Sequence, residues 1–250
     1  MVSPTSPAFA LLARLGVLPA LAELPPSRST PVRRLGVVGH SGITIERLTL
    51  PGRAVLFDVG DAVDTLHIVL QGALKTVARE ESGDERITSF VRRGEVIGFE
   101  HTKDGRHAAE AVALEPSVVL ALPVAGLEAM SMDDPTLLRL WWRTCAEPME
   151  RHAAQLVLLA QRLVHERLER FLWSLVPAPT ATANDAPRLH LAMGRGEIAS
   201  YLGMTNESVS RAFAKLVDDG RIRVRGRHVD LLLVPESPSR LAGSLAGRRA

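Results

Sequence analysis

The chain has 250 residues, and its content of 46% hydrophobic and 23% charged residues is typical of a folded globular protein rather than a disordered one. Its single cysteine, Cys145, excludes an internal disulfide and any iron–sulfur cluster or zinc site that is held by three or four cysteines. The formal net charge is only +2, but residues 186–250 carry 11 Lys and Arg against 6 Asp and Glu, which indicates that this C-terminal part meets a polyanion.

Residues 1–35 form an N-terminal extension that is rich in Pro, Ala and Leu. Pro4, Pro7 and Arg14 interrupt its apolar stretch and no basic region precedes it, so we do not expect a signal peptide. Nowhere does the chain contain the roughly 18 consecutive apolar residues that a membrane-spanning helix needs. The sequence therefore predicts a cytoplasmic protein with no membrane partner, and it assigns no function to the extension.

Residues 36–130 are expected to form an all-β domain. Short runs of Val, Ile and Leu alternate there with polar residues, and glycines between Gly52 and Gly105 recur mostly every 8 to 12 residues. Turns at such regular intervals predict a β-sandwich or a β-barrel, although the period alone does not distinguish a jelly roll from another sandwich. The four clearest runs are 66–70, 73–77, 87–91 and 117–122.

Residues 131–177 show helical periodicity. Asp134 is a candidate N-cap for a short helix that ends at Arg143, and Pro148 fits the first turn of a second, longer helix. Along the second helix one stripe repeats every three or four residues, which predicts the seam of a two-stranded coiled coil and hence a dimer interface. A neighbouring apolar stripe leaves open a helix that is buried on two sides of a monomer. The seam residues are Met149, Ala153, Leu156, Ala160, Leu163 and Arg167.

A proline-rich linker at 178–187 separates these helices from a compact unit at 188–234. Two short helices joined by the turn Gly203-Met204-Thr205 predict a helix-turn-helix, whose second helix runs from Asn206 to Asp219. Two β runs then flank a basic tip, which indicates a β-hairpin wing. The remaining residues, 235–250, are a C-terminal tail.

The second helix of a helix-turn-helix lies in the major groove of DNA. Glu207, Ser210 and Arg211 share one face of this helix and are the predicted base-reading residues, because Arg pairs with guanine, Glu with cytosine and Ser with several bases. The alternative for Glu207 and Arg211 is a surface ion pair worth a few tenths of a kcal/mol. The predicted supporting or phosphate contacts are Thr205, Asn206, Ser208, Lys215, Arg221, Arg223, Arg225 and Arg227.

The segments 198–211 and 220–227 together resemble the DNA-binding domain of the CRP/FNR family of bacterial transcription regulators. Segments 60–72 and 94–99 resemble the effector-domain roll of that family. The resemblance implies an α+β fold with an N-terminal β-roll (a double-stranded β-helix or jelly roll), a long dimerisation helix and a C-terminal winged helix-turn-helix. The pattern Glu-x-x-Ser-Arg at 207–211 resembles the FNR-type branch, which implies a homodimer that reads a palindrome of TTGAT half-sites and contacts RNA polymerase.

The resemblance leaves the controlling signal open. CRP-like members hold a cyclic phosphate with an Arg-Ser or Arg-Thr pair, whereas this chain has His107-Ala108 at the aligned positions, so a cyclic nucleotide is not expected. One cysteine does not supply an iron–sulfur cluster. Cys145 is either a redox thiol or a buried structural residue, and control by abundance alone is a further alternative. No cofactor is predicted, and the candidate haem ligands, by location only, are His67, His101, His107 and His152.

An enzyme is the competing class of function. The roll resembles the cupin architecture, and His101, His107 and Glu110 are similar to a cupin metal set, but the tight His-x-His pair of cupins is missing. No Ser/His/Asp set, P-loop or Rossmann fingerprint is evident either. We therefore expect a sequence-specific transcription regulator and no enzyme. The alternatives are a cupin-like metalloenzyme fused to a DNA-binding module, a haem-based gas sensor, and an architectural DNA-binding protein with a steep salt dependence.

Overall fold

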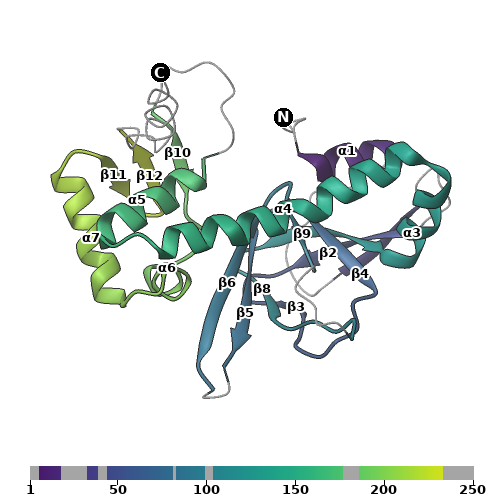
Figure 1. Ribbon diagram of the computed structural model, residues 1–250, viewed down its shortest axis with the longest axis horizontal. Helices are drawn as coiled ribbons and strands as arrows, with labels where there is room; N and C mark the ends of the chain where they lie inside the picture. The colour runs from purple at the N-terminus through teal and green to yellow at the C-terminus, as the bar shows by residue number, and fades with distance from the viewer. Residues whose placement is uncertain are drawn as a thin grey trace, which may run out of the picture. The chain divides into compact units, whose positions relative to one another are not determined.

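The computed structural model of the chain describes residues 6–17, 33–38, 44–80, 83–98, 104–176 and 186–232. The chain forms two compact units, Met1–Ala154 and Gln155–Ala250 (Figure 1). The first is rich in β-strands and the second contains a helix-turn-helix, which confirms the expected α+β fold class. No helix in the described ranges combines the length and the apolar character that a membrane crossing requires.

Two antiparallel sheets form the β-rich part of the first unit (Figure 1). The larger has the strand order β1-β2-β9-β4-β7 and the smaller the order β3-β8-β5-β6. The late strand β9 lies between the early strands β2 and β4, a pairing that is typical of a jelly-roll-like sandwich. The strands are β1 (Arg33–Val38), β2 (Thr44–Leu50), β3 (Val55–Phe57), β4 (Thr65–Gln71), β5 (Ala73–Arg79), β6 (Glu85–Arg92), β7 (Val96–Ile97), β8 (Glu110–Ala113) and β9 (Ser117–Pro123).

The central strands β4 and β9 of the five-stranded sheet are buried on both faces. Successive side chains of a strand point to opposite faces, so a strand that is apolar at every position is covered on both sides. On β4, Val69 packs in the cluster between the sheets with Phe57 and Leu74. Leu66 and Ile68 belong instead to a second cluster, which includes residues from three helices. This arrangement explains why β4 and β9 are buried over most of their length.

One of those helices, α1 (Pro7–Arg14), lies in the segment to which the sequence analysis assigned no function. Leu11 and Leu12 are fully buried in the second cluster, where α1 packs with residues of the sheet and of the helices α3 (Val124–Asp133) and α4 (Pro135–Leu159) (Figure 1). Phe9 lies so close to Gly94 that a Cβ atom there would be 2.9 Å from its ring. The N-terminal helix is therefore part of the core of the first unit.

The helix α4 runs without a break from Pro135 to Leu159, and Pro148 lies inside it. The prediction of one helix that ends at Arg143 and another that begins at Pro148 is therefore wrong. A proline inside a helix removes one backbone hydrogen bond and crowds the preceding turn. Burial of Pro148 itself, and packing of Leu137 and neighbouring residues on the second cluster, offset this local penalty.

The second predicted helix is also interrupted. Residues 160–163 are not helical, and α5 (Val164–Ser174) begins only after them. The predicted seam is therefore not one continuous helical stripe, since Ala160 and Leu163 lie in the interruption and Arg167 lies on α5. Periodicity did not reveal this break because the apolar spacing continues through it.

The second unit contains a helix-turn-helix followed by a hairpin, as predicted. Gly203, with φ of +61°, ends the first helix in the left-handed conformation that favours glycine, and the second helix begins three residues later, at Asn206. The small sheet has the order β10-β12-β11. Most of the predicted linker and the whole of the tail lie outside the described residues. The elements are β10 (Arg188–His190), α6 (Arg195–Leu202), α7 (Asn206–Asp218), β11 (Ile222–Arg225) and β12 (His228–Leu231).

Candidate nucleic-acid interface

Hydroxyl groups hold the start of α7 in place. Thr205 is the N-cap, and its Oγ1 accepts a hydrogen bond from the backbone N–H of Ser208 at 3.1 Å and donates one to the Ser208 Oγ at 2.8 Å. Ser210 donates its hydroxyl to the carbonyl of Asn206 at 2.9 Å. The cap satisfies a backbone N–H that has no partner within the helix, which stabilises the start of α7.

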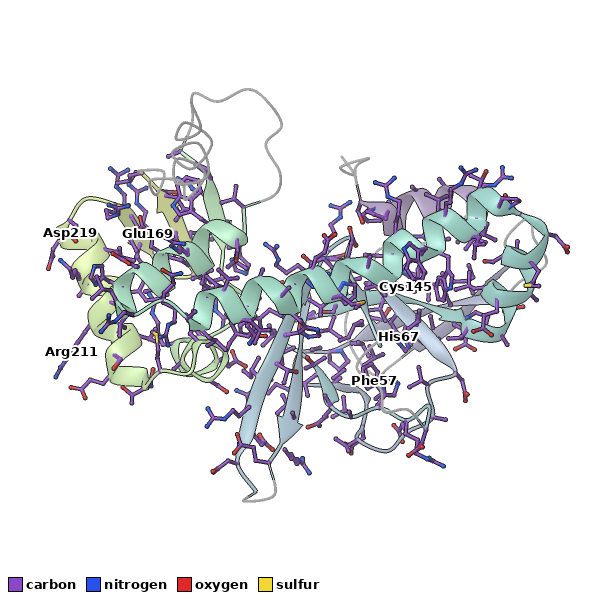
Figure 2. All side chains as sticks on the ribbon, in the orientation of Figure 1. Phe57, His67, Cys145, Glu169, Arg211 and Asp219 are labelled. Atoms are coloured by element: carbon purple, nitrogen blue, oxygen red, sulfur yellow. The ribbon has the colours of Figure 1, made fainter. Side chains whose placement is uncertain are left out.

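Glu207 and Arg211 lie side by side on the exposed face of α7, where Arg211 is labelled in Figure 2. Their side chains are 72% and 79% exposed, and the Arg211 Nη2 is 2.5 Å from the Glu207 Oε1. The structure thus contains the surface ion pair that the sequence analysis left as an alternative. An exposed pair of this kind is weak, so it opens readily when either group meets a better partner.

The opposite face of α7 anchors the helix in the second unit. Val209, Phe213 and Leu216 are buried there, and the Arg195 guanidinium carbon lies 3.0 Å from the centroid of the Phe213 ring. Burial lowers the pKa of Arg195, yet its ordinary value is so high that the guanidinium keeps its charge at neutral pH. One face of α7 is therefore packed in the second unit, and the other face, with Glu207 and Arg211, is exposed to solvent.

The arginines around the wing differ in their surroundings. The Arg221 Nε lies 2.5 Å from the Oε1 of Glu169, whose side chain is only 6% exposed. Arg227 donates to the carbonyl of Ala192 at 2.8 Å. Within the part of the chain that the structure describes, Arg223 and Arg225 form no ion pair. Of these four predicted phosphate contacts, two thus stabilise the fold and two are available to a ligand.

Two acidic residues that the sequence analysis did not single out hold this region together. Glu169 lies on α5 among apolar residues, and a carboxylate within an apolar stripe is a sequence signal for a buried ion pair. Asp230, on the central strand of the small sheet, accepts a hydrogen bond from Arg188 at 2.7 Å. This bond lowers the pKa of Asp230.

Arg167, which was predicted in the dimer seam, makes its contacts within the chain. Its guanidinium donates to the carbonyl of Leu202 at 2.9 Å and to the carbonyl of Gln161 at 2.6 Å. One bond reaches the last residue of α6, and the other reaches the interruption that precedes α5. Arg167 therefore links the non-helical residues between α4 and α5 to the end of α6.

Of the candidate haem and cupin residues that the structure describes in the first unit, His67 and His107 both lie next to the ring of Phe57. The His107 ring stacks on Phe57 with ring centroids 3.6 Å apart, and the His67 ring lies 6.0 Å from Phe57 (Figure 2). Glu110 pairs with Arg79 at 3.6 Å, and His101 lies outside the described residues. Among the residues that are described, no group of three or more His, Cys, Asp and Glu is placed to hold a metal ion.

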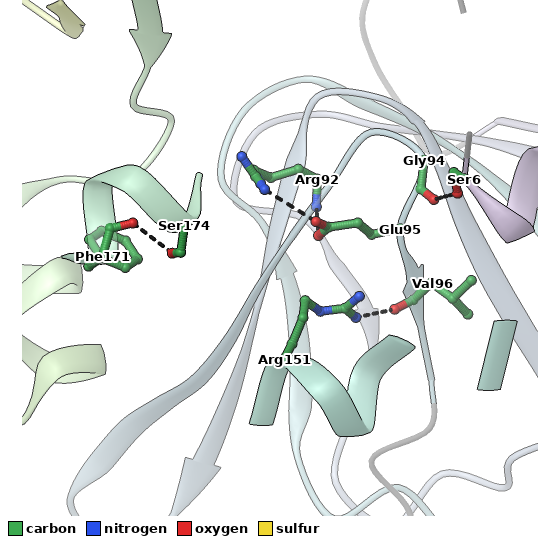
Figure 3. Close-up of polar contacts among 8 residues, drawn as sticks. All are labelled: Ser6, Arg92, Gly94, Glu95, Val96, Arg151, Phe171 and Ser174. Atoms are coloured by element: carbon green, nitrogen blue, oxygen red, sulfur yellow. Dashed lines mark hydrogen bonds and ion pairs between the residues drawn. The ribbon is translucent and has the colours of Figure 1, made fainter. Parts of the chain in front are cut away.

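Charged residues lie where α4 meets the edge of the roll (Figure 3). Arg151 donates to the carbonyl of Val96 at 3.0 Å, and Arg92 pairs with Glu95 at 3.3 Å. Desolvation by burial raises the pKa of Glu147 on the same helix. Burial also raises the pKa of the half-buried Cys145 thiol to about 11, so this thiol is protonated at neutral pH and is a poor nucleophile.

Comparisons with known proteins agree with this geometry. Residues 47–134 match the family model of a cyclic nucleotide-binding domain, and residues 166–236 match that of a Crp-like helix-turn-helix domain. The anaerobic regulatory protein of Pasteurella multocida (strain Pm70) is 32% identical over 177 residues, which are 71% of this chain and 65% of that protein. The fumarate and nitrate reduction regulatory protein of Escherichia coli (strain K12) is 30% identical over 176 residues, 70% of each chain.

Solved structures show the same fold. FixK2 from Bradyrhizobium japonicum matches with a TM-score of 0.64 and 24% identity, over 79% of this chain and 95% of that one. A transcriptional regulator of the CRP/FNR family from Thermus thermophilus, TTHA1359, matches with a TM-score of 0.56 and 22% identity, over 81% of this chain and all of that one. At these identities the likeness concerns the fold alone.

Proposed function

Because this chain belongs to the CRP/FNR family of transcription regulators, we propose that it binds DNA as a homodimer and reads a palindrome of TTGAT-like half-sites through α7. The observation that carries the proposal is the adjacent pair Glu207 and Arg211 on the free face of a capped and anchored helix. Its relatives are regulators, and the chain is accordingly a transcription regulator rather than an enzyme.

We assign the base contacts to three residues of the exposed face. Arg211 binds the guanine of each half-site through its O6 and N7 atoms, and Glu207 accepts from a base of the complementary strand. Ser210 contacts a thymine. On binding, Arg211 exchanges the weak pair with Glu207 for a bidentate contact that water no longer screens.

Phosphate contacts set the register of the dimer on the duplex rather than its sequence preference. Arg223 and Arg225 are the main candidates on the wing, because neither guanidinium pairs with a carboxylate in the described part of the chain. Thr205, Asn206 and Ser208 surround the N-terminus of α7, where a helix attracts a phosphate.

Apolar side chains exposed along α4 support dimerisation through this helix. Trp142, Met149 and Leu156 follow one another at intervals of seven residues and are 73%, 73% and 69% exposed. The exposed Ala153 lies between them and allows close approach of a second helix. Large apolar side chains in such a row are typical of an interface with a partner. Trp142 extends the predicted seam, because α4 begins before Pro148.

The signal that controls the regulator is not part of the proposal. No cyclic nucleotide, iron–sulfur cluster or haem is assigned, and contact with RNA polymerase is proposed from membership of the family alone. A role for Cys145 as a redox switch would need a thiolate, which the raised pKa of its thiol disfavours.

The test is the selection of bound sequences from a random DNA pool by the purified full chain, without added ligand. Enrichment of a TTGAT-like palindrome supports the proposal. Enrichment of unrelated sites contradicts FNR-type reading. Binding without sequence preference and with a steep salt dependence indicates an architectural protein instead.

A further inference from the structure

The outer face of the small sheet in the second unit carries two histidines side by side. β10 pairs antiparallel with β12, so that His190 lies directly opposite His228 (Figure 1). Both histidines are exposed, whereas their neighbours Leu189 and Val229 are buried. Because successive side chains of a strand point to opposite faces, the two imidazoles project from the same, solvent-exposed face.

The backbone hydrogen bonds of the sheet bring these two side chains close together. Leu191, which follows His190, donates its N–H to the carbonyl of Arg227, which precedes His228, at 2.8 Å. In an antiparallel ladder, hydrogen-bonded pairs alternate with pairs that have no hydrogen bond between them, so His190 and His228 form a pair of the second kind. Side chains in such pairs approach more closely than in hydrogen-bonded pairs.

The arrangement of the two rings fits a shared metal ion. Their centroids are 5.2 Å apart, and their planes are inclined by 52°. An imidazole nitrogen binds Zn²⁺ at about 2.0–2.1 Å, so each ring centroid lies about 3 Å from the ion, and two imidazoles on one tetrahedral ion have centroids about 5 Å apart. The observed separation matches that value, so a metal ion could bind without movement of the strands.

The charges around the pair favour a metal that prefers nitrogen ligands. Arg225 on β11 lies opposite His228 on the other side of β12. Further along the same face, Asp230 accepts a hydrogen bond from Arg188 at 2.7 Å, so its carboxylate already has a partner. Imidazoles beside a guanidinium are a poor site for Mg²⁺ and Ca²⁺, which need several oxygen ligands. Imidazole ligands suit Zn²⁺, Ni²⁺ and Cu²⁺.

We propose that His190 and His228 bind one divalent transition-metal ion of this class, with water in the remaining coordination positions. The protein supplies two ligands rather than the four of a closed structural zinc site, so the ion is exchangeable. The two ligands are distant in the sequence, and the pairing of β10 with β12 creates the site. Both ligands belong to the second unit, so the proposal goes beyond DNA binding and does not depend on it.

Metal binding would fasten β10 to the wing hairpin. β10 has only three residues, and in the described part of the sheet it pairs with β12 alone. A short strand at the edge of a sheet, with few contacts, opens more readily than a central one. A ligand that binds only the folded state stabilises it. Bound metal should therefore slow amide hydrogen exchange in β10.

The experiment measures the binding of Zn²⁺ and Ni²⁺ to the full chain, produced without a histidine tag and freed of metal, by isothermal titration calorimetry. It is carried out at pH 8, because metal binding requires the neutral imidazole. His190→Gln and His228→Gln should each weaken binding by about 10-fold or more, since losing a ligand costs at least as much as losing a residue that orients one. His165→Gln removes a histidine of α5 in the same unit and is the matched control, which should bind as the wild type does.

Two further readouts test whether the two histidines act together. The electron paramagnetic resonance spectrum of bound Cu²⁺ should show coupling to ligand nitrogens in the wild type, and this signal should be lost in both His190→Gln and His228→Gln. Zn²⁺ should slow hydrogen exchange in β10 of the wild type and of His165→Gln only. Both ligand positions are exposed, so circular dichroism should show that the variants keep the fold.

Undiminished binding in either His190→Gln or His228→Gln overturns the proposal. So does the absence of binding by the wild type at metal concentrations up to about 1 mM, which corresponds to a free energy of binding weaker than about −4 kcal/mol. Loss of binding in His165→Gln to the same extent would also contradict it, because the ion would then not be held by this pair. These measurements contain no DNA, so their outcome is separate from that of the proposed function.

Discussion

At the scale of single residues, similar side chains have different functions because their surroundings differ. Arg221 is held by the buried carboxylate of Glu169, whereas Arg223, two residues further along the chain, has no such partner in the described part of the chain. A buried carboxylate holds its partner firmly, since separating the pair leaves an uncompensated charge in a poorly solvated place. Basic residues near the wing are therefore not interchangeable as phosphate contacts.

Replacing Arg211 by Ala should weaken binding to the selected site by about 1–3 kcal/mol and relax the preference at one base pair in each half-site. The physical reason is the loss of a bidentate contact to guanine. Arg223→Ala is the control, because a lost phosphate contact weakens all sequences alike. Fluorescence anisotropy with single-base variants of the site measures both effects. An unchanged base preference in Arg211→Ala would contradict the assigned role.

Glu169→Gln should lower the free energy of unfolding by about 1–3 kcal/mol, less than for a fully enclosed pair because Arg221 is partly exposed. Arg223→Ala should change it by less than about 0.5 kcal/mol, as is usual for a surface residue. Urea denaturation followed by circular dichroism distinguishes the two variants. Equal stability of Glu169→Gln and the wild type would show that the buried pair contributes nothing net.

Cys145 should react slowly with a thiol reagent in the folded protein. With the pKa of its thiol raised to about 11, the thiolate fraction at pH 8 is roughly 200-fold lower than for an ordinary cysteine with a pKa near 8.5. In denaturant, Cys145 should be alkylated as fast as an ordinary cysteine. Alkylation rates measured by mass spectrometry with and without urea provide the test, and fast labelling of the folded chain would revive the redox hypothesis.

At the scale of elements, the helix α4 has two different faces. Its N-terminal half packs Leu137 and Trp141 on the sheet of the first unit, while the face with Trp142, Met149 and Leu156 is exposed. Burying a large apolar side chain is worth about 1.5–3 kcal/mol, so pairing these residues with those of a second copy provides a strong driving force. The proposed dimer thus depends on a helix that the first unit covers on one side only.

Leu156→Glu should yield a monomer that no longer binds the palindrome specifically, because it places a charge in the middle of the exposed stripe. Ala154→Glu is the matched control, since Ala154 is also exposed but lies on another face of the helix. Light scattering reports the mass of each variant in solution. A dimer that persists in Leu156→Glu would contradict an interface through α4.

At the scale of the whole molecule, the N-terminal helix completes the core of the first unit. Arg14, the last residue of α1, is 2.6 Å from Asp134, and Asp134 also accepts hydrogen bonds from the first backbone N–H groups of α4. The hydrogen bond that the Arg14 side chain donates to Asp134 is the main reason that the pKa of Asp134 is lowered. The same helix therefore covers the sheet and contacts the start of the helix that carries the proposed interface.

Deleting residues 1–17 should destabilise the first unit strongly, because it uncovers apolar side chains of the sheet such as Ile45 and Leu122. With about 1.5–3 kcal/mol for each large apolar side chain withdrawn, the loss is comparable with the total stability of a typical domain. Increased fluorescence of an apolar dye and a lower melting temperature are the expected results. Deleting only residues 1–5, which keeps α1, is the control, and equal behaviour of the two deletions would contradict the packing role.

Local physical signals in the sequence were sufficient for the helix-turn-helix and the hairpin of the second unit, and for the strands β4, β5, β6 and β9 of the first. The left-handed glycine Gly203, the capping residue Thr205 and the alternation of apolar and polar residues in strands all depend on residues that are close in sequence. They can therefore be identified from the sequence before the fold is known. Those signals correctly predicted the helix-turn-helix and the hairpin, whereas the α+β class was implied by the resemblance to the family. The face shared by Glu207 and Arg211 followed from helical spacing in the same way.

Only the tertiary structure decided what each surface is packed against. The burial of α1, the continuity of α4 through Pro148, and the pairing of Arg221 with Glu169 all depend on residues distant in the sequence. The spacing of residues in the sequence predicts which side chains share one face of a helix or strand. Which other residues pack against that face depends on the whole fold. The interruption before α5 was hidden for the same reason, because Arg167 fastens it to the carbonyl of Leu202, 35 residues away.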